Sequence, residues 1–503
     1  MTNAKPVLFE WQREDLNDLA SKGYVGLLAY EVGAGKTIVA CAAIEESRSR
    51  VTLIVAPKST FTTAWIPTLE MFGMKGRIIG NGKKDHREAM SDFLLGYPGV
   101  YLTTSALISR KSTDISGWSG DMLVLDEIHQ MITPKSSAQR RISGYVARDG
   151  EPLAARFPMR IGLSGTPLRQ SFVNVWGVSK TLFPEYDGRG EISDYNHVQW
   201  MFDRMDYVEV YTNQRDHNGQ PKKVKQFLHE KTPGLWASEA PAIYIHKRRE
   251  ACCKWHGPKY LSDGTYHPGG FLEMTSPQVI ERRVELAPAQ QKAIRELQDS
   301  AMTYLEDNPL VADLSIVQQQ RIRQMCLGIP TLTYTEIDGE EKVNINWDDN
   351  CVSPFMDEVE QILSEIPEDE PVLLYLDSQR FAEVAARRLN AAGISAAEYS
   401  GKTSGVRDQY FAEFGKKYRV LVAVTSAFGT GTNGAQKICQ NEIWIEQPIK
   451  LVDRIQVEGR TDRIGAKGQT QRYLILDSFG YAEGRLDDHL EKRLLINSSL
   501  KKA

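Results

Sequence analysis

The chain has 503 residues, of which 41% are hydrophobic and 25% are charged, and its formal net charge is −4. This length is enough for two to four folded domains. No apolar run approaches the roughly 18–20 residues of a membrane span, and residues 1–10 lack the charged-then-apolar layout of an export signal. The net charge argues against a protein that coats nucleic acid by bulk positive charge, but it leaves a local phosphate-binding groove open.

Cysteine content indicates the cellular compartment. Six cysteines are too few for a disulfide scaffold, which favours a reducing environment. We therefore expect a cytoplasmic protein that is not secreted and has no membrane partner.

Short β-rich runs alternate with helix-like segments in two parts of the chain. In the first part the runs cover residues 52–56, 100–104, 122–125 and 160–164. In the second part they cover residues 372–376, 396–399, 420–425, 442–446 and 472–476. This alternation is typical of parallel sheets covered by helices. We predict an α/β protein with two such lobes.

The region between the two series is rich in aromatic and charged residues and has weak strand signals. Residues 288–326 are predicted to be helical, and residues 331–347, with Asp338-Gly339 in the middle, to form a β-hairpin. We therefore divide the chain into a first lobe at 1–185, an insert and linker at 186–352, a second lobe at 353–482 and a C-terminal helix at 483–503.

A glycine-rich turn joins the apolar run at residues 25–29 to a helix-like run at residues 37–48. The turn reads Tyr30-Glu-Val-Gly33-Ala-Gly35-Lys36-Thr37. Backbone amides in such a turn cradle phosphate oxygens, Lys36 reaches the β- and γ-phosphates, and the Thr37 hydroxyl binds Mg²⁺. The first glycine of the full pattern is replaced by Tyr30, and an ordinary strand-to-helix turn is the alternative.

Two acids follow the apolar run at residues 122–125, at the sheet edge where α/β proteins bind ligands. Asp126 would hold Mg²⁺, and Glu127 would orient and deprotonate the attacking water, so we expect ATP and Mg²⁺ as cofactors. Surface acids at a strand end are the alternative. Ser164-Gly-Thr166 follows another predicted strand and offers hydroxyls suited to sensing the γ-phosphate.

Three further side chains are candidates for the same site. Gln12 precedes the glycine-rich turn and is expected to bind the adenine edge, with a solvent-facing glutamine as the alternative. Arg460 and Arg463 are spaced i, i+3, which on a helix puts both on one face. Delivered from the second lobe, they would stabilise transition-state charge, and a plain surface pair is the alternative.

These segments together resemble the superfamily 2 helicases, and specifically their SWI/SNF-like branch. Residues 53–65, from Leu53 through Pro57-Lys58-Ser59 to Trp65, are similar to the branch's strand-then-Pro-Ser…Trp signature. Three further segments resemble other signatures of the branch. They are Leu163 to Leu168 with Trp176, Phe183 and Pro184, then Ile322-Arg323 to Pro330, and then Trp444 and Pro448 with Gln456 to Gly465. The resemblance extends from Leu8 to about Leu476.

The resemblance implies two RecA-like lobes and ATP-driven tracking along DNA. It places Gly431 at the ATP cleft, and it implies DNA contacts at Lys58, Ser59, Thr104, Arg407, Thr425 and Asn433. The chain departs from the family pattern at Tyr30, at Phe355, where a lysine is usual, and at Gly431-Thr432-Asn433, where Gly-Leu-Asn is usual. These departures put the nucleotide preference and the DNA contacts in doubt.

Other interpretations have less support. Cys252, Cys253, His256 and His267 lack two Cys-x-x-Cys pairs, so we expect no structural zinc. Trp200, Trp236 and Trp255 are expected to be core residues rather than base-stacking ones. Two other functional classes are considered. One is an RNA helicase, because an Asp-Glu-x-His box is widespread among RNA unwinders. The other is a nucleic-acid-binding scaffold whose ATPase is inactive.

No segment resembles a histone-reading module, which favours a compact motor of bacterial, archaeal or viral origin. We expect it to track on duplex DNA and to remodel forks or four-way junctions by branch migration, in replication, recombination or repair. The aromatic insert between Tyr186 and Trp255 is expected to contact the junction. The alternative is a translocase that displaces DNA-bound proteins without unwinding.

Overall fold

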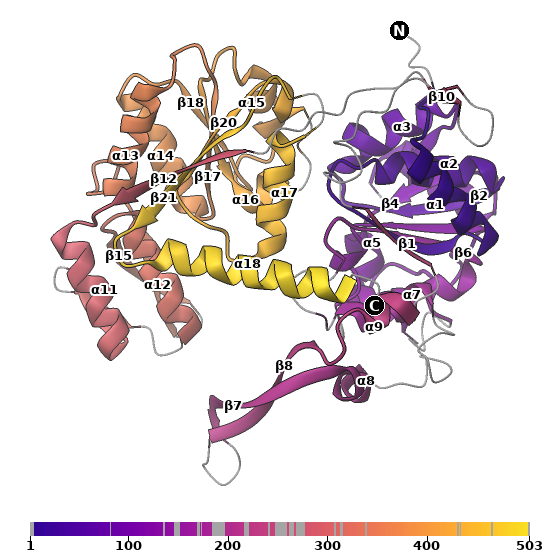
Figure 1. Ribbon diagram of the computed structural model, residues 1–503, viewed down its shortest axis with the longest axis horizontal. Coiled ribbons are helices and arrows are strands. Elements are labelled where there is room, and N and C mark those ends of the chain that lie inside the picture. The colour runs from indigo at the N-terminus through magenta and orange to yellow at the C-terminus, as the bar shows by residue number, and fades with distance from the viewer. Residues whose placement is uncertain are drawn as a thin grey trace. The chain divides into compact units, whose positions relative to one another are not determined.

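The computed structural model divides the chain into two compact units (Figure 1). The first contains residues 1–273 and 492–503, and the second contains residues 274–491. The structure describes residues 5–80, 82–133, 136–144, 151–167, 172, 174–183, 197–215, 221–239, 242–246, 259–260, 266–267, 277–305, 308–311, 315–337, 340–429, 432, 434–463 and 466–500. No helix in these residues is long and apolar enough to cross a membrane.

The first unit is built on a seven-stranded sheet with the order β3-β4-β2-β5-β6-β1-β9. All neighbouring strands pair in parallel. Their bounds are β1 Val25–Tyr30, β2 Val51–Val55, β3 Gly76–Ile78, β4 Gly99–Thr103, β5 Met122–Asp126, β6 Met159–Leu163 and β9 Ile243–His246. Because the strands are parallel, all their carboxyl ends lie at one edge of the sheet.

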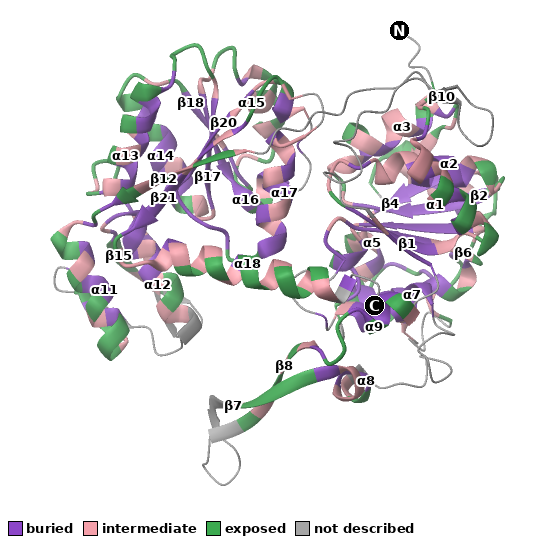
Figure 2. Ribbon diagram, in the orientation of Figure 1, coloured by how far each residue is buried: buried purple, intermediate pink, exposed green. Residues whose placement is uncertain are grey.

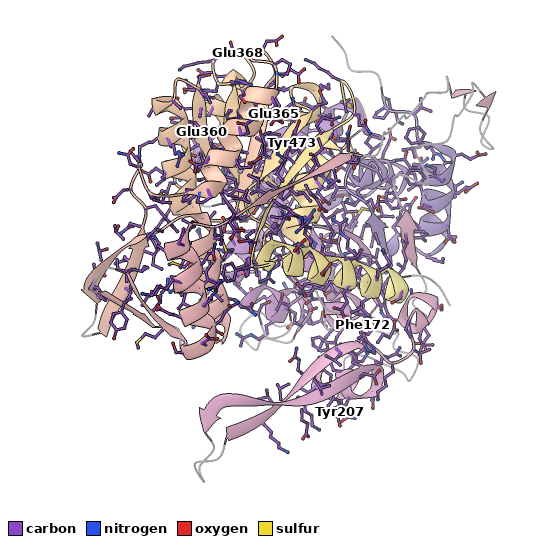
Figure 3. The ribbon with its side chains drawn as sticks, turned by 60° about the vertical axis from the view of Figure 1, so that its left-hand side comes forward. Phe172, Tyr207, Glu360, Glu365, Glu368 and Tyr473 are labelled. Carbon is purple, nitrogen blue, oxygen red and sulfur yellow. The ribbon has the colours of Figure 1, made fainter. Side chains whose placement is uncertain are left out.

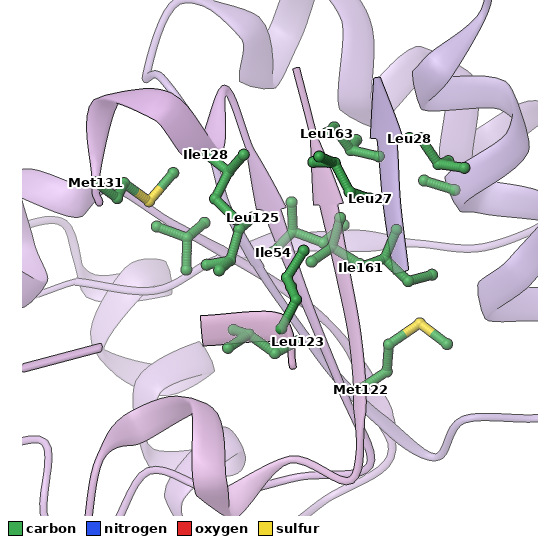
Figure 4. Close-up of a cluster of buried hydrophobic side chains, with 14 of the residues drawn as sticks. Leu27, Leu28, Ile54, Met122, Leu123, Leu125, Ile128, Met131, Ile161 and Leu163 are labelled. Atoms are coloured by element: carbon green, nitrogen blue, oxygen red, sulfur yellow. The ribbon is translucent and has the colours of Figure 1, made fainter. Parts of the chain in front are cut away.

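Apolar runs explain why this sheet is buried on both faces. Strands β2 and β5 read VTLIV and MLVLD, and every residue in them is buried. Figure 4 shows side chains of β1, β5 and β6, among them Leu27, Leu125 and Ile161, gathered in one cluster. Continuous apolar strands of this kind are expected where helices cover both faces.

Helices connect and cover these strands. They are α1 Glu10–Ser21, α2 Lys36–Glu46, the π-helix η1 Phe61–Trp65, α3 Ile66–Met71, α4 Lys84–Leu94, α5 Ser105–Ser109, the 3₁₀ turns η2 Ile128–Gln130 and η3 Leu153–Arg156, α6 Ser137–Ser143, α7 Asn174–Leu182, α8 His197–Arg204 and α9 Leu235–Glu239. Helices α2 and α7 lie on opposite sides of the sheet (Figure 1).

An antiparallel hairpin extends from the first unit (Figure 1). It consists of β7 Met205–Arg215 and β8 Pro221–Glu230, and Tyr207 pairs with Phe227 and Glu209 with Lys225. Most of its described residues are exposed, as the green ribbon of Figure 2 shows. The short strands β10 Lys259–Tyr260 and β11 Tyr266–His267 pair with each other further along the chain.

The second unit contains a six-stranded parallel sheet with the order β12-β21-β20-β17-β19-β18. Its strands are β12 Gln278–Val284, β17 Val372–Leu376, β18 Ala396–Tyr399, β19 Val420–Val424, β20 Asn441–Trp444 and β21 Gln471–Asp477. Its helices are α11 Pro288–Ser300, α12 Ser315–Leu327, α13 Pro354–Glu365, α14 Gln379–Ala391, α15 Arg407–Glu413, α16 Thr425–Gly429, the 3₁₀ turn η5 Ala435–Lys437, α17 Leu451–Thr461 and α18 Tyr481–Leu500, the last continuing beyond the unit.

Two predictions for the central region have different outcomes. The hairpin expected at residues 331–347 is present as β15 Thr331–Ile337 and β16 Glu340–Asn346. The continuous helix expected at residues 288–326 is wrong, because the hairpin of β13 Met302–Leu305 and β14 Asn308–Val311 separates α11 from α12. Ala301 has a left-handed backbone, with φ 56°, and it ends α11 directly before β13 begins.

The region predicted as a separate insert, residues 186–352, is shared between the two units. Its strand β9 joins the first sheet beside β1, and β12 joins the second sheet beside β21. Both strands lie at sheet edges, where sequence signals are weak: β9 has only four residues, and β12, with the sequence QVIERRV, is rich in charged and exposed residues. The α/β fold with two parallel-sheet lobes is confirmed.

Candidate functional site

The glycine-rich turn connects β1 to α2 and has the backbone that its glycines predict. Gly33 and Gly35 have φ values of 86° and 88°, in the left-handed region that favours glycine. A Cβ on Gly35 would lie 2.6 Å from Nε2 of Gln12, so a side chain there would also displace its neighbour. The turn delivers Lys36 as the first residue of α2, whose N-terminal amides and dipole favour an anion.

Gln12 holds the turn from α1. Its side chain is buried, its Nε2 donates to the Ala34 carbonyl at 3.0 Å, and its Oε1 accepts from the Phe9 amide at 2.9 Å. The solvent-facing alternative is therefore wrong. Gln12 supports the turn through Ala34, and its contact with adenine stays a prediction.

The Lys36 ammonium lies between the turn and the segment after β6. It donates to the Tyr30 carbonyl at 2.9 Å. A Cβ on Gly165 would lie 3.4 Å from the Lys36 Nζ and 3.1 Å from Val32, so this segment approaches the turn closely. Thr37 is half-buried as the second residue of α2. The structure thus brings the Ser164-Gly-Thr166 segment next to the glycine-rich turn, at the sheet edge that the sequence predicted.

Asp126 ends β5 at the same sheet edge, because β5, β6 and β1 are adjacent and parallel. Its Oδ2 accepts from the Trp65 indole at 2.8 Å, and its Oδ1 accepts from the Glu127 amide at 3.0 Å. Burial and the neighbouring Glu127 carboxylate raise the pKa of Asp126 to about 7, against smaller opposing effects of Trp65 and Lys36. Both hydrogen-bond donors are neutral, so a bound divalent cation would offset the free-energy cost of burying the charged carboxylate. Asp126 and Thr37 supply oxygen ligands of the type that Mg²⁺ prefers.

Glu127 has a left-handed backbone, with φ 50° and ψ 48°. Non-glycine residues in this region are uncommon and cluster at functional sites. Glu127 Oε2 lies 3.2 Å from Nδ1 of the buried His129, which is 2.8 Å from the Ser164 hydroxyl. The same hydroxyl accepts from the Thr166 amide at 3.0 Å. His129 therefore links the residue expected to activate water to the segment after β6.

Sequence reasoning missed two members of this site, Trp65 and His129. Both were visible in the motifs, Trp65 at the end of the Pro-Ser…Trp segment and His129 in the Asp-Glu-x-His box. Neither motif shows that Trp65 donates to Asp126, because the two residues are 61 positions apart.

The arginine pair lies in the second unit, and its predicted geometry is wrong. Helix α17 ends at Thr461, so Arg460 is in its last turn whereas Arg463 follows it. Asp462, with ψ 77°, leaves the helical conformation, while the Thr461 hydroxyl donates to the buried Glu442. The Arg460 guanidinium donates to the carbonyls of Thr432, at 2.7 Å, and Gly429. The two arginines therefore do not share one helix face, and their catalytic roles stay predictions.

The residues expected at DNA lie on both units. Lys58 is exposed and Ser59 half-buried after β2, and Thr104 caps α5 by accepting from the Leu107 amide at 3.2 Å. Strands β2 and β4 are neighbours, so these residues follow adjacent strands at one sheet edge. In the second unit, Arg407 lies over the Tyr399 ring at 5.5 Å, and the buried Thr425 donates to Asp377 at 2.9 Å.

Several predicted residues lie outside the described part of the chain. They are Gly431 and Asn433, and also Leu168, Pro184, Ile464, Gly465, Cys252, Cys253, Trp255 and His256. Trp200 and Trp236 are described and buried, as expected. Across the ranges that the structure covers, no group of three or more His, Cys, Asp or Glu residues could hold a metal ion.

Comparison with known proteins agrees with the motifs. Residues 11–201 match the family described as SNF2-related domain. The chain is similar to the ISWI chromatin-remodeling complex ATPase ISW1 of Saccharomyces cerevisiae, with 22% identity over 40% of this chain and 16% of that protein. It is 27% identical to the probable ATP-dependent DNA helicase CHR12 of Arabidopsis thaliana, over 32% of this chain and 14% of that protein.

The chain is also 27% identical to the nuclear protein STH1/NPS1 of S. cerevisiae, over 32% of this chain and 12% of that protein. These alignments span less than a fifth of the relatives' length. A solved SWI2/SNF2 ATPase core from Sulfolobus solfataricus in complex with dsDNA aligns at a TM-score of 0.39 and 14% identity, covering 99% of this chain and 95% of that one. The motifs and the family match indicate that residues 11–201 form an SNF2-related domain, of the SWI/SNF-like, superfamily 2 helicase type.

Proposed function

We propose that this SWI/SNF-like protein hydrolyses ATP with Mg²⁺ and uses the energy to move along duplex DNA. The observation that carries the proposal is the meeting of Lys36, Asp126 and Glu127 at one edge of the first sheet. Two separate sequence segments supply these parts: a glycine-rich turn suited to phosphate, and a pair of adjacent carboxylates, of which one is suited to a cation and the other lies 3.2 Å from a buried histidine. Together these are the parts that phosphoryl transfer to water requires.

Each residue has a distinct role in this proposal. The amides of the turn and the Lys36 ammonium would bind phosphate oxygens, and Thr37 and Asp126 would hold Mg²⁺, which would offset charge on the phosphates. Glu127 orients a water molecule and accepts its proton. Because His129 contacts both Glu127 and Ser164, it fixes the orientation of the Glu127 carboxylate. Gly431 belongs to the nucleotide site by the family resemblance.

The second unit supplies positive charge in this mechanism. Arg460 and Arg463 are proposed to stabilise the negative charge that develops on the transferred phosphoryl group. The contacts of Arg460 with the Thr432 and Gly429 carbonyls also give it a role in holding these two residues. We expect Arg463→Ala and Arg460→Ala each to slow hydrolysis by roughly 10³-fold while ATP still binds.

Duplex DNA is the proposed track. The relatives named above include a chromatin-remodeling ATPase and a probable DNA helicase. Lys58, Ser59 and Thr104, which follow adjacent strands, are suited to phosphate contacts, and Arg407, Thr425 and Asn433 are proposed to complete the track on the second unit. Phosphate contacts carry no sequence information, so binding should depend on salt and little on sequence.

We further propose that the DNA substrate is branched and that the β7–β8 hairpin contacts the branch. The Lys225 ammonium lies 4.4 Å from the Phe202 ring centre and 4.7 Å from that of Tyr207. Tyr207 remains 40% exposed on the extended hairpin (Figure 3). An isolated two-stranded hairpin gains little stability from its own contacts, so a functional contact would explain its length.

One set of ATPase measurements separates this function from its alternatives. Duplex DNA should stimulate hydrolysis more than RNA does, and the stimulation should decrease as salt rises because phosphate contacts release counterions. Equal stimulation by single-stranded RNA would favour an RNA helicase, and no hydrolysis under any condition would favour a scaffold.

The branched substrate needs a second measurement. ATP-dependent conversion of a mobile four-way junction, a fork and a blunt duplex should be greatest for the junction and the fork. Replacing residues 206–229 by a short glycine-containing turn should reduce that conversion while retaining stimulation by linear duplex. No strand displacement on any substrate would instead favour a translocase that displaces bound proteins.

A further inference from the structure

A buried hydrogen bond in the first unit joins the Asp126 carboxylate to Trp65. Trp65 is fully buried, and its indole N–H donates to Asp126 Oδ2 at 2.8 Å. An indole has a single hydrogen-bond donor and no acceptor, so the bond to this carboxylate uses its only donor. A hydrogen bond to a charged group is among the stronger ones in proteins.

Trp65 ends a π-helix that follows the proposed DNA-contacting segment directly. Helix η1 covers Phe61–Trp65 and is followed without a break by α3. Phe61 and Trp65 are buried while Thr62 and Thr63 between them are exposed. A π-helical turn is rare, and it occurs frequently at functional sites.

Hydrogen bonds make residues 57–65 one connected segment. The Thr60 amide donates to the Pro57 carbonyl at 2.9 Å, and the Phe61 amide donates to the Lys58 carbonyl at 3.3 Å. The Thr63 hydroxyl donates to the Ser59 carbonyl at 2.7 Å. These bonds connect the backbone at Lys58 and Ser59 with the π-helix that carries the Trp65 indole.

We propose that Trp65 is a positioning residue that couples DNA contact at Lys58 and Ser59 to the orientation of the Asp126 carboxylate. This inference rests on the proposed function, since it needs residues 57–65 to contact DNA. The indole acts through Asp126 and touches neither nucleotide nor DNA. A purely structural tryptophan would instead satisfy its N–H and pack in the core without responding to DNA.

The first test monitors the Trp65 indole by ¹⁹F NMR. The protein is labelled with 5-fluorotryptophan, and the ¹⁹F resonance that is missing from Trp65→Phe identifies Trp65 among the nine tryptophans. Duplex DNA added without nucleotide should shift the Trp65 resonance. The resonance of Trp118, a buried tryptophan of the same unit that contacts Phe93 at 5.7 Å between ring centres, should not shift.

Enzyme kinetics provide the second measurement. Trp65→Phe should reduce the ratio of DNA-stimulated to basal ATPase by about tenfold or more, as loss of a hydrogen bond to a charged group predicts. Trp118→Phe, which also removes a buried indole, should retain the wild-type ratio. DNA binding with an unmoved Trp65 resonance would overturn the coupling. A protein that binds no duplex DNA would overturn the proposed function as well, and fluorescence anisotropy distinguishes the two failures.

Discussion

The two units carry acidic side chains at equivalent places but neutralise them differently. In the first unit, Asp126 is the last residue of a central strand and accepts hydrogen bonds from an indole and a backbone amide, both neutral. In the second unit, Asp377 follows β17 and Glu446 follows β20, and the strands are neighbours. Arg323 of α12 donates to Asp377 at 2.8 Å and lies 3.2 Å from Glu446.

The second cluster also has hydrogen bonds between its own residues. Glu446 Oε2 accepts from the amides of Asp377 and Ser378, at 2.9 and 2.8 Å, and the Thr425 hydroxyl donates to Asp377. Burial raises the pKa of Glu446, and Arg323 opposes that increase. A carboxylate with an internal counterion contributes to folding, whereas one with only neutral donors is suited to bind a cation from outside. We therefore predict that Asp126 serves the function of the first unit and that the cluster of Arg323, Asp377 and Glu446 stabilises the fold of the second.

The largest expected effect is on turnover in the first unit. Glu127→Gln should lower ATP hydrolysis by roughly 10³-fold, because the amide cannot accept a proton from water. ATP binding, measured by equilibrium titration, should persist because Lys36 and the turn are unchanged. Lys36→Ala is the comparison variant and should weaken binding instead. Near-normal hydrolysis by Glu127→Gln would show that another group activates water.

The second expected effect is on the stability of the second unit. Arg323→Met removes the shared cation and leaves Asp377 and Glu446 buried without it, which should lower the free energy of unfolding by about 3–5 kcal/mol. Urea denaturation measures this change, and adding Glu446→Gln should restore part of it. Arg295→Met, on the exposed face of α11, is the control and should have little effect. A loss below about 1 kcal/mol would contradict a structural role for this cluster.

Sequence patterns predicted which segments meet at the edge of the first sheet, because each of these segments is local. The turn at Gly33–Thr37 and the Asp126-Glu127 pair each need only a strand and the residues after it, and parallel strands bring them to one edge. Side chains that act across long separations were not predictable in this way. Arg323 was noticed only within a family motif, and its partners lie 54 and 123 positions away. Helix α17 ends before Arg463, at Thr461, whose hydroxyl donates to Glu442 19 positions away.

The smallest expected effect is on the free energy of unfolding, which the buried Asp126 carboxylate lowers when it is charged. Its pKa of about 7 in the folded protein exceeds the value of about 3.9 for an exposed aspartate, so the folded state binds more protons between these values. The free energy of unfolding should therefore decrease as pH rises from about 4 to about 7. Asp126→Asn removes this contribution and should raise the free energy of unfolding by roughly 2 kcal/mol at pH 8, with a smaller gain at pH 5.

A second aspartate of the same unit provides the control for Asp126→Asn. Asp121 accepts from the amides of Arg50 and Val51 at 2.7 and 2.9 Å, so Asp121→Asn should lower the free energy of unfolding rather than raise it. Mg²⁺ with ATP should stabilise the wild type and have a much smaller effect on Asp126→Asn, because a ligand stabilises only the state that binds it. Destabilisation by Asp126→Asn at pH 8 would show that this carboxylate, like Asp377, serves the fold, and the contrast between the two units would then fail.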